Sequence, residues 1–334
     1  MTALEGVPLG VLDLAWREHG QSNADAVRAS VDLARVAEQL GYRRHWFAAH
    51  HGLPVSAASQ PPILIAAAAA ATTTIRVGSG ALLLSNYSPL AIAEQFGTLT
   101  ALYGDRIDLG LGRSSGGFPA AAVRRAGGVA SGYAQDVADL LGCFHGGRSP
   151  EDPMERVLAV PGRGDAPETW LLGSGSGFSA RLAGELGLPF AYAHHFAPRD
   201  TEDVLAVYRR AFRPSEHVRK PRTMISVMLA AHEDPVRLRE EMLLGDITHL
   251  RLHAGQRADP VSAQDAQSYL FSARDRAILA ERHARQAVGT PAEVEERLRS
   301  LLASTGADEL MLQVVGATAD GRRRSLQIAR ELAG

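Results

Sequence analysis

The sequence lacks several features that would place it in well-defined classes of protein. It contains a single cysteine, Cys143, which excludes an internal disulfide and a metal site built from cysteines. The formal net charge of −2 gives no basic excess for binding nucleic acid or an anionic membrane. The apolar run 63–71 is bounded by prolines and threonines, far short of the roughly 20 residues that span a bilayer. With no basic and apolar leader after Met1, we expect a soluble, cytoplasmic protein.

The elements that the sequence does contain alternate between strand and helix. Short β-branched or leucine-rich runs predict strands at 7–15, 43–49, 75–84, 106–111, 169–172, 189–193, 223–231 and 308–315. Segments with helical periodicity lie between them. They are 24–40, the alanine-rich stretch that ends at residue 71, 89–103, 119–145, 179–186, 201–212, 290–302 and 322–332. A loop rich in proline, glycine and charge is expected up to residue 168.

Eight alternating units predict a parallel sheet closed into a (β/α)8 TIM barrel, and 334 residues suit one such domain, 1–334. The polar segment 233–286 interrupts the rhythm, and we interpret it as a partly helical insertion after the seventh strand, able to act as a lid. Thr290 to Glu293 then forms a capping box that opens the next helix. Because the reactive face of a barrel lies at the carboxyl ends of its strands, the candidates are Asp13, His50, Ser79 to Ala81, Arg113, Gly173 to Ser179, His194, His195 and the loop after Val315.

Adjacent histidines, His50 and His51, lie where the second predicted strand ends. A neutral imidazole can donate, accept or carry a proton near pH 7, so this position favours chemistry. Alternation along a strand points the two side chains in opposite directions, which predicts one in the cavity and one as a structural partner. A hydrogen-bonded structural pair is the alternative, and no nearby spacing favours a metal.

Two glycine-rich loops follow predicted strands. The loop 110–117 resembles a dinucleotide-binding loop, but Ser115 replaces the third glycine and no helix begins there, so Arg113 is its more informative residue. The loop Gly173 to Gly177 opens a helix, and its backbone N–H groups favour a phosphate. A serine-capped turn is the alternative there. One of His194 and His195 is expected at the same mouth.

Five segments in order resemble the bacterial luciferase-like flavin-dependent monooxygenases. They are 42–51 with its two histidines, 77–81, 108–113, 170–174 and 307–311, and together they span nearly the whole chain. The likeness is greatest to the single-chain group associated with oxidative tailoring in natural-product pathways. It implies a barrel that binds FMN, receives it reduced from a separate reductase, and activates O2 as a flavin C4a-peroxide. It also implies a homodimer.

The resemblance assigns roles residue by residue. His50 falls on the family's catalytic histidine, Arg113 lies near the flavin, and Gly80-Ala81 falls on a non-proline cis peptide beneath the flavin ring. The resemblance implies that the cofactor lies at Gly80, Ala81, Arg113, Gly173, Ser174, Gly175, Ser176 and Gly177. From their positions at strand ends, Ser79 and His194 are also expected to bind it. Ala49 replaces the family's usual glutamate, which removes a carboxylate from the flavin's surroundings.

We therefore expect a monooxygenase that inserts one oxygen atom from O2 into a small organic substrate, with His50 and Arg113 as catalytic residues. Two alternatives stay open: a reductase of the same superfamily that uses F420, and a flavin-binding protein without catalysis. No metal is expected. The substrate cannot be deduced from the sequence, because the loops that form the pocket walls are variable.

Overall fold

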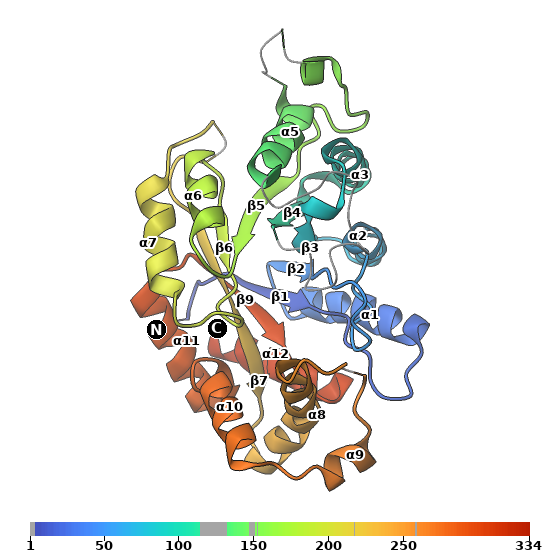
Figure 1. Ribbon diagram of the computed structural model, residues 1–334, viewed down its shortest axis with the longest axis vertical. Helices are drawn as coiled ribbons and strands as arrows, with labels where there is room; N and C mark the ends of the chain where they lie inside the picture. The colour runs from blue at the N-terminus through green and yellow to red at the C-terminus, as the bar shows by residue number, and fades with distance from the viewer. Residues whose placement is uncertain (1–3, 114–131, 147–150, 152, 217, 258) are drawn as a thin grey trace.

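Eight parallel strands of the described chain close into a barrel at the centre of the molecule (Figure 1). The computed structural model describes residues 4–113, 132–146, 151, 153–216, 218–257 and 259–334. The barrel strands are β1 (Leu9–Asp13), β2 (Arg44–Phe47), β3 (Arg76–Leu83), β4 (Ile107–Gly112), β5 (Glu168–Gly173), β6 (Phe190–Tyr192), β7 (Thr223–Ala231) and β9 (Glu309–Val314). They follow one another in this order, and β9 pairs with β1 to close the ring. The predicted TIM barrel is confirmed.

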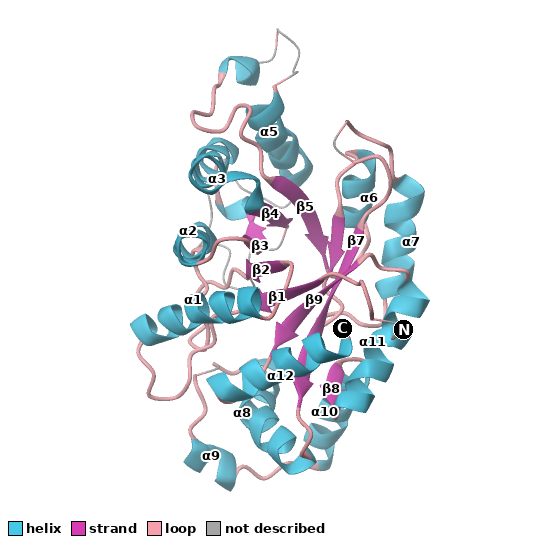
Figure 2. Ribbon diagram, turned by 180° about the vertical axis from the view of Figure 1, so that it is seen from behind, coloured by secondary structure: helices cyan, strands magenta, loops and turns pink. Residues whose placement is uncertain are grey.

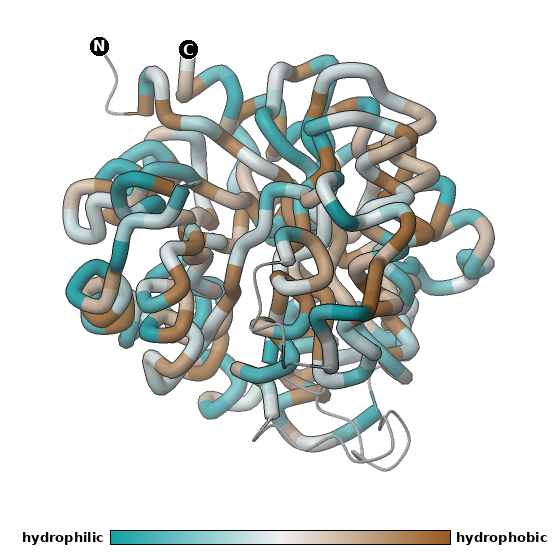
Figure 3. The backbone as a smooth tube through the Cα atoms, turned by 90° about the horizontal axis from the view of Figure 1, so that it is seen from above, coloured by the Kyte–Doolittle hydropathy of each residue, from teal (hydrophilic) through white to brown (hydrophobic). Residues whose placement is uncertain are grey.

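Helices surround the barrel, as Figure 2 shows. They are α1 (Asn23–Gln39), α2 (Pro61–Ala71), α3 (Pro89–Tyr103), α5 (Tyr133–His145), α6 (Phe178–Glu185), α7 (Thr201–Ala211), α8 (Pro235–His253), α9 (Ala263–Ser268), α10 (Ala273–Ala284), α11 (Pro291–Thr305) and α12 (Ala319–Leu332). Hydrophilic and hydrophobic residues alternate along the outer helices in Figure 3, as expected for helices with one buried face. Among the described residues, no helix combines the length and apolar character needed to cross a membrane.

Three predicted elements differ from the structure. The segment 233–286 is mainly helical rather than partly so, since α8, α9 and α10 occupy most of it. A ninth strand that we did not predict, β8 (Ala287–Gly289), pairs with the carboxyl-terminal end of β7. Three residues are too few to show the alternation that identifies a strand in a sequence. Of the helix predicted at 119–145, the structure contains α5, and 119–131 lies outside the described residues.

The capping box at the start of α11 forms as predicted. The Thr290 backbone N–H and hydroxyl both donate to Glu293 Oε2, at 2.8 Å each. Gly306 ends the helix with a φ of 57°, a left-handed conformation that glycine adopts without steric cost.

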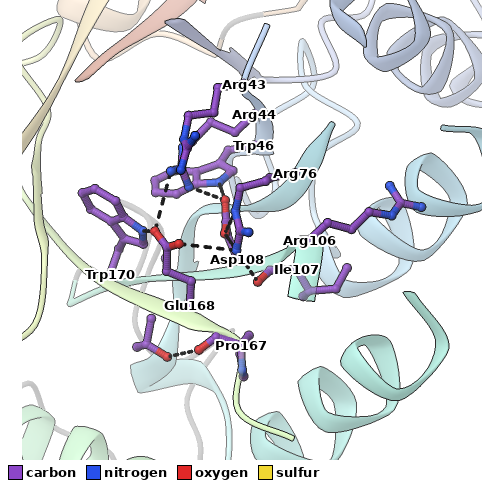
Figure 4. A network of polar contacts seen from close by, with 12 residues as sticks. Arg43, Arg44, Trp46, Arg76, Arg106, Ile107, Asp108, Pro167, Glu168 and Trp170 are labelled. Atoms are coloured by element: carbon purple, nitrogen blue, oxygen red, sulfur yellow. Dashed lines mark hydrogen bonds and ion pairs between the residues drawn. The ribbon is translucent and has the colours of Figure 1, made fainter. Parts of the chain in front are cut away.

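A buried ion-pair network closes the amino-terminal end of the barrel (Figure 4). Arg44, which is fully buried, contacts Asp108 at 2.5 Å and Glu309 at 2.9 Å. Arg76 pairs with Asp108 at 2.7 Å, and Arg222 pairs with Glu168 at 3.0 Å and with Glu309 at 2.5 Å. Burial disfavours the guanidinium charge of Arg44, but the surrounding carboxylates outweigh burial and raise its pKa. Arg44, Arg76 and Arg222 thus face Asp108, Glu168 and Glu309 at this end, and Arg43 lies 4.0 Å from Glu309.

Two tryptophans cover the network from inside the barrel. The Trp46 indole N–H donates to Asp108 at 2.8 Å and the Trp170 N–H to Glu168 at 2.7 Å. The two rings pack edge to face with their centroids 5.8 Å apart. Gly78 permits this arrangement, because a Cβ there would lie 2.5 Å from Asp108 Cβ. The two tryptophan rings thus fill the interior of the barrel above the ion-pair network.

Candidate active site

A cavity of about 1440 Å³ opens at the carboxyl ends of the barrel strands. Its lining comes from the segments that follow β1, β2, β3, β4, β5, β6 and β9, together with α8 and α10. Drug-sized ligands occupy pockets of roughly 300–1,000 Å³, so this space holds more than one such molecule. The cavity therefore has room for a cofactor and a substrate together.

His50 lines this cavity and His51 does not. The pair lies three and four residues beyond β2 rather than at a strand end, because the chain leaves the sheet after Phe47. The His50 backbone N–H donates to the Ala58 carbonyl at 2.8 Å, which fixes the loop. The His50 ring has a buried Nδ1 without a hydrogen-bond partner in the described chain, which leaves Nε2 as the nitrogen on the cavity side. Burial and, second, the neighbouring His51 lower the pKa of His50, so its ring is neutral at pH 7.

His194 does not line the cavity, and its neighbour His195 does. Both ring nitrogens of His194 are already used, at 2.7 Å from Thr201 Oγ1 and at 2.7 Å from the Arg285 carbonyl. The prediction that His194 contacts the cofactor is corrected in favour of His195. The sequence placed one histidine of the pair at the mouth, but it could not show which, because the chain leaves β6 at Tyr192 and alternation no longer applies.

Ser226 sets the tautomer of His195. The His195 Nδ1 lies 2.8 Å from Ser226 Oγ and 3.4 Å from the Ser226 carbonyl, which can only accept. The Ser226 hydroxyl in turn donates to the Tyr192 carbonyl at 3.3 Å. Nδ1 therefore carries the proton, and Nε2 of His195 remains an acceptor. Burial lowers the pKa of His195 to about 4, helped by the nearby His194 and His50.

The stability of the protein is expected to fall as the pH is lowered from 6.5 to about 4. An unfolded chain protonates histidine near pH 6.5, whereas folded His195 stays neutral until the pH reaches about 4. The unfolded state therefore binds more protons in this window. We expect His195→Gln to have a shallower fall of Tm across pH 6.5 to 4.5 than the unsubstituted protein. The measurement is thermal unfolding at each pH, with pH 8 as the baseline, and identical slopes would contradict the assignment.

Gly80 and Ala81 line the cavity, and the peptide bond between them is cis, as the resemblance implies. Ser79 is different: it is fully buried, and its hydroxyl donates to the Gly110 carbonyl at 2.9 Å. The same oxygen accepts the Gly110 N–H at 3.1 Å. The prediction that Ser79 binds cofactor is therefore corrected, because its side chain joins β3 to β4 and lies away from the cavity.

The loop Gly173 to Gly177 also lines the cavity, as predicted. In the described chain, the N–H groups of Ser174, Gly175 and Ser176 donate to no protein acceptor, and no side chain caps the start of α6. A Cβ at Gly175 would meet nothing within 4 Å, so the loop borders open space. Arg113 lies nearby, with its guanidinium 4.8 Å from the centre of the Phe178 ring. Free N–H donors beside an arginine suit a phosphate.

Asp13 ends β1, but it does not line the cavity. Its carboxylate accepts hydrogen bonds from the Ser30 hydroxyl and from the Ala15 N–H, and it lies 3.5 Å from His45 Nε2. Burial alone would raise the pKa of Asp13, but His45 and these donors outweigh burial and lower it. Asp13 is thus removed from the candidates, and it instead ties α1 to the barrel.

Several lining residues were not candidates from the sequence. The loop after β1 contributes Trp16, Arg17, Glu18 and His19, and α8 contributes residues from Glu241 to His253. The loop after Val315 contributes Gly316 and Ala317, as expected. Sequence signals for α8 are weak, because its apolar and polar residues form no clear helical stripe. Within the part of the chain that the structure describes, no three His, Cys, Asp or Glu side chains cluster as metal ligands.

Comparison with known proteins identifies the family. Residues 8–309 match the model of the luciferase-like monooxygenases, so the chain belongs to this family of oxidoreductases. A protein of Escherichia coli (strain K12) named luciferase-like monooxygenase is 38% identical, over 98% of this chain and 97% of that protein. The N-acetyl-S-alkylcysteine monooxygenase of Bacillus subtilis is 34% identical over 62% of each chain.

Several solved structures have a fold similar to that of this protein. The apo form of MsnO8 superimposes with a TM-score of 0.86 at 34% identity, covering 98% of both chains. The oxygenating component of 3,6-diketocamphane monooxygenase from Pseudomonas putida, in complex with FMN, has a TM-score of 0.70 at 20% identity and covers 100% of this chain. An F420-dependent secondary alcohol dehydrogenase has a TM-score of 0.67 at 14% identity and covers 98% of this chain. The last two likenesses concern the fold alone.

Proposed function

We propose that the protein is an FMN-dependent monooxygenase that transfers one oxygen atom from O2 to a small organic substrate. The observation that carries this function is the shared cavity. Its lining includes the phosphate donors of Gly173 to Gly177, the neutral rings of His50 and His195, and the small residues Gly80 and Ala81. Family membership supports monooxygenase chemistry. Reduced FMN would come from a separate reductase, which stays a prediction, as does the homodimer.

The residues of the cavity fit a flavin mononucleotide. Its phosphate would accept the unpaired N–H groups of Ser174, Gly175 and Ser176 and the charge of Arg113. Its flat ring system would lie over Gly80 and Ala81, where small side chains allow close approach. When bound, reduced FMN supplies the two electrons with which O2 yields one oxygen atom to the substrate and one to water.

The protein's own part is to position reactants, to exclude water and to move protons. The neutral His50 presents Nε2 to the cavity and can accept or release a proton there. His195 offers a second acceptor nitrogen, fixed by Ser226. Leu12, Met224, Met228 and Met311 form apolar walls, which keep water from the reacting atoms.

The segment 233–286 is proposed to be the lid that excludes solvent. Helices α8 and α10 within it contribute lining residues, from Glu241 to Arg282, so the segment already borders the cavity. We expect binding of FMN to slow limited proteolysis within 233–286. Cleavage of this segment at equal rates with and without FMN would contradict a lid.

Two titrations and one oxygen measurement test the proposed function. We expect the visible spectrum of FMN to shift on binding to this protein, and F420 to bind more weakly. Reduced FMN with aldehyde or ketone substrates should then consume O2 with oxygenated product. Tight F420 binding with reduction of a substrate and no O2 uptake would favour the reductase alternative. Flavin binding without turnover would favour a non-catalytic role.

A further inference from the structure

Arg17 is an arginine of the cavity wall without an acidic partner in the part of the chain that the structure describes. Four arginines of the described chain line the cavity: Arg17, Arg113, Arg282 and Arg322. Arg282 pairs with Asp246 at 2.9 Å, and Arg322 pairs with Glu18 at 3.0 Å. No carboxylate among the described residues lies within ion-pair distance of Arg17. A half-buried cation with no counter-ion favours an anionic ligand.

The backbone holds Arg17 firmly at the cavity wall. Trp16 forms a β-bridge with Ser56, and the Arg17 N–H donates to the Val55 carbonyl at 2.9 Å. The Arg17 side chain donates from Nε to the Pro54 carbonyl at 3.0 Å. Its two terminal amino groups donate to no described residue, and together they form the fork that matches a carboxylate. The loop that contains His50 therefore also positions Arg17.

Arg17 lies across the barrel from the proposed phosphate site. It follows β1, whereas Gly173 to Gly177 follows β5, and four steps around the ring separate these strands in either direction. One anionic group cannot reach both ends of the cavity at once. With the phosphate of FMN at the β5 side, Arg17 is left for the second molecule, which is the substrate.

Apolar side chains line the cavity on both loops that hold Arg17: Leu14 and Trp16 on one, Leu53 and Val55 on the other. Two acidic side chains of the cavity lining are already occupied: Glu18 pairs with Arg322, and Glu241 accepts the Thr318 N–H at 2.9 Å and hydroxyl at 2.7 Å. This end of the cavity thus combines apolar surface with one available cation.

We propose that Arg17 binds a carboxylate at one end of an otherwise apolar substrate. The substrate class is then an organic acid whose apolar body extends from Arg17 past His50 toward the flavin ring. This assignment rests on the proposed function for the position of the flavin. It is a role in specificity, since Arg17 would hold the end of the substrate that does not react.

The test compares an acid with its neutral amide on the FMN-loaded protein. Isothermal titration calorimetry would use 6-phenylhexanoate and 6-phenylhexanamide, which differ only in charge and in the terminal group. We expect the acid to bind about tenfold or more tightly than the amide, as charge-assisted hydrogen bonds provide. Arg17→Gln should abolish this preference, and Arg17→Lys should retain part of it because the charge stays. Thermal unfolding of each variant checks that it folds.

Arg113→Gln is the matched control at the other end. It is expected to weaken FMN binding, measured by the visible spectrum, and to keep the preference for the acid. Equal binding of acid and amide, or a preference that survives Arg17→Gln, would overturn the role of Arg17. Acid binding that needs Arg113 and is displaced by inorganic phosphate would also overturn it. Failure of FMN to bind at all would instead reject the proposed function, and the FMN titration detects this separately.

Discussion

Replacing His50 with alanine is expected to lower kcat by about 10²- to 10⁴-fold, the range that general acid–base catalysis contributes. The ring lines the cavity, its Nδ1 is buried, and Nε2 is the nitrogen on the cavity side. Since burial lowers the pKa of His50, the ring is neutral and able to accept a proton at pH 7. The measurement is steady-state O2 consumption with reduced FMN and an oxygenated product, together with an FMN titration.

The pH dependence separates a chemical role for His50 from a structural one. A proton acceptor with a lowered pKa loses activity only when the pH falls below the ordinary histidine value of about 6.5. The acid limb of kcat/KM should therefore lie below pH 6.5, and it should be absent from the residual activity of His50→Ala. His51→Ala is the matched control, because His51 adjoins His50 but does not line the cavity. Equal losses in both variants, or unchanged turnover in His50→Ala, would reject the assignment.

The barrel could be predicted because its signal repeats. Strand and helix periods alternate eight times, and parallel strands require such crossovers, so errors at single boundaries do not change the fold. β8 was missed because three residues carry no periodicity. The position of α8 and α10 along the cavity depends on tertiary packing, which the local sequence patterns of this segment do not predict.

Local sequence signals predicted some of the residues that line the cavity, but they did not predict the directions of side chains in the loops. Gly173 to Gly177 and His50 line the cavity as predicted, since a glycine-rich turn and a histidine pair after predicted strands are local signals. His194 and His195 could not be told apart, and Ser79 was misassigned, because side-chain direction beyond a strand end depends on the tertiary structure. Arg17 went unnoticed for the same reason. One signal could have found it: an arginine in the loop after the first strand, on the reactive face.

Replacing Arg44 with methionine is expected to cost about 3–5 kcal/mol of unfolding free energy, the usual loss when one partner of a buried ion pair is removed. Arg44 is fully buried between Asp108 and Glu309, at 2.5 and 2.9 Å. Its loss leaves three carboxylates facing Arg76, Arg222 and the more distant Arg43, which lies 4.0 Å from Glu309. It also removes the guanidinium that lies 5.5 Å from the Trp46 ring centre and 5.3 Å from that of Trp170. Urea unfolding followed by tryptophan fluorescence measures the change.

Arg28 provides the control for charge alone. It pairs with Asp25 at 3.1 Å on an exposed face of α1, so Arg28→Met should change the unfolding free energy by less than about 1 kcal/mol. A loss of that small size in Arg44→Met would show that the network is not a stabilising centre.

The decisive comparison adds Asp108→Asn to Arg44→Met. If the cost comes from an uncompensated buried carboxylate rather than from lost packing, neutralising Asp108 should recover part of the stability, although Arg76 then keeps only Glu168, at 3.4 Å, as a charged partner among the described residues. Recovery would show that the amino-terminal end of the barrel is held by charge balance, leaving the carboxyl-terminal end free for chemistry.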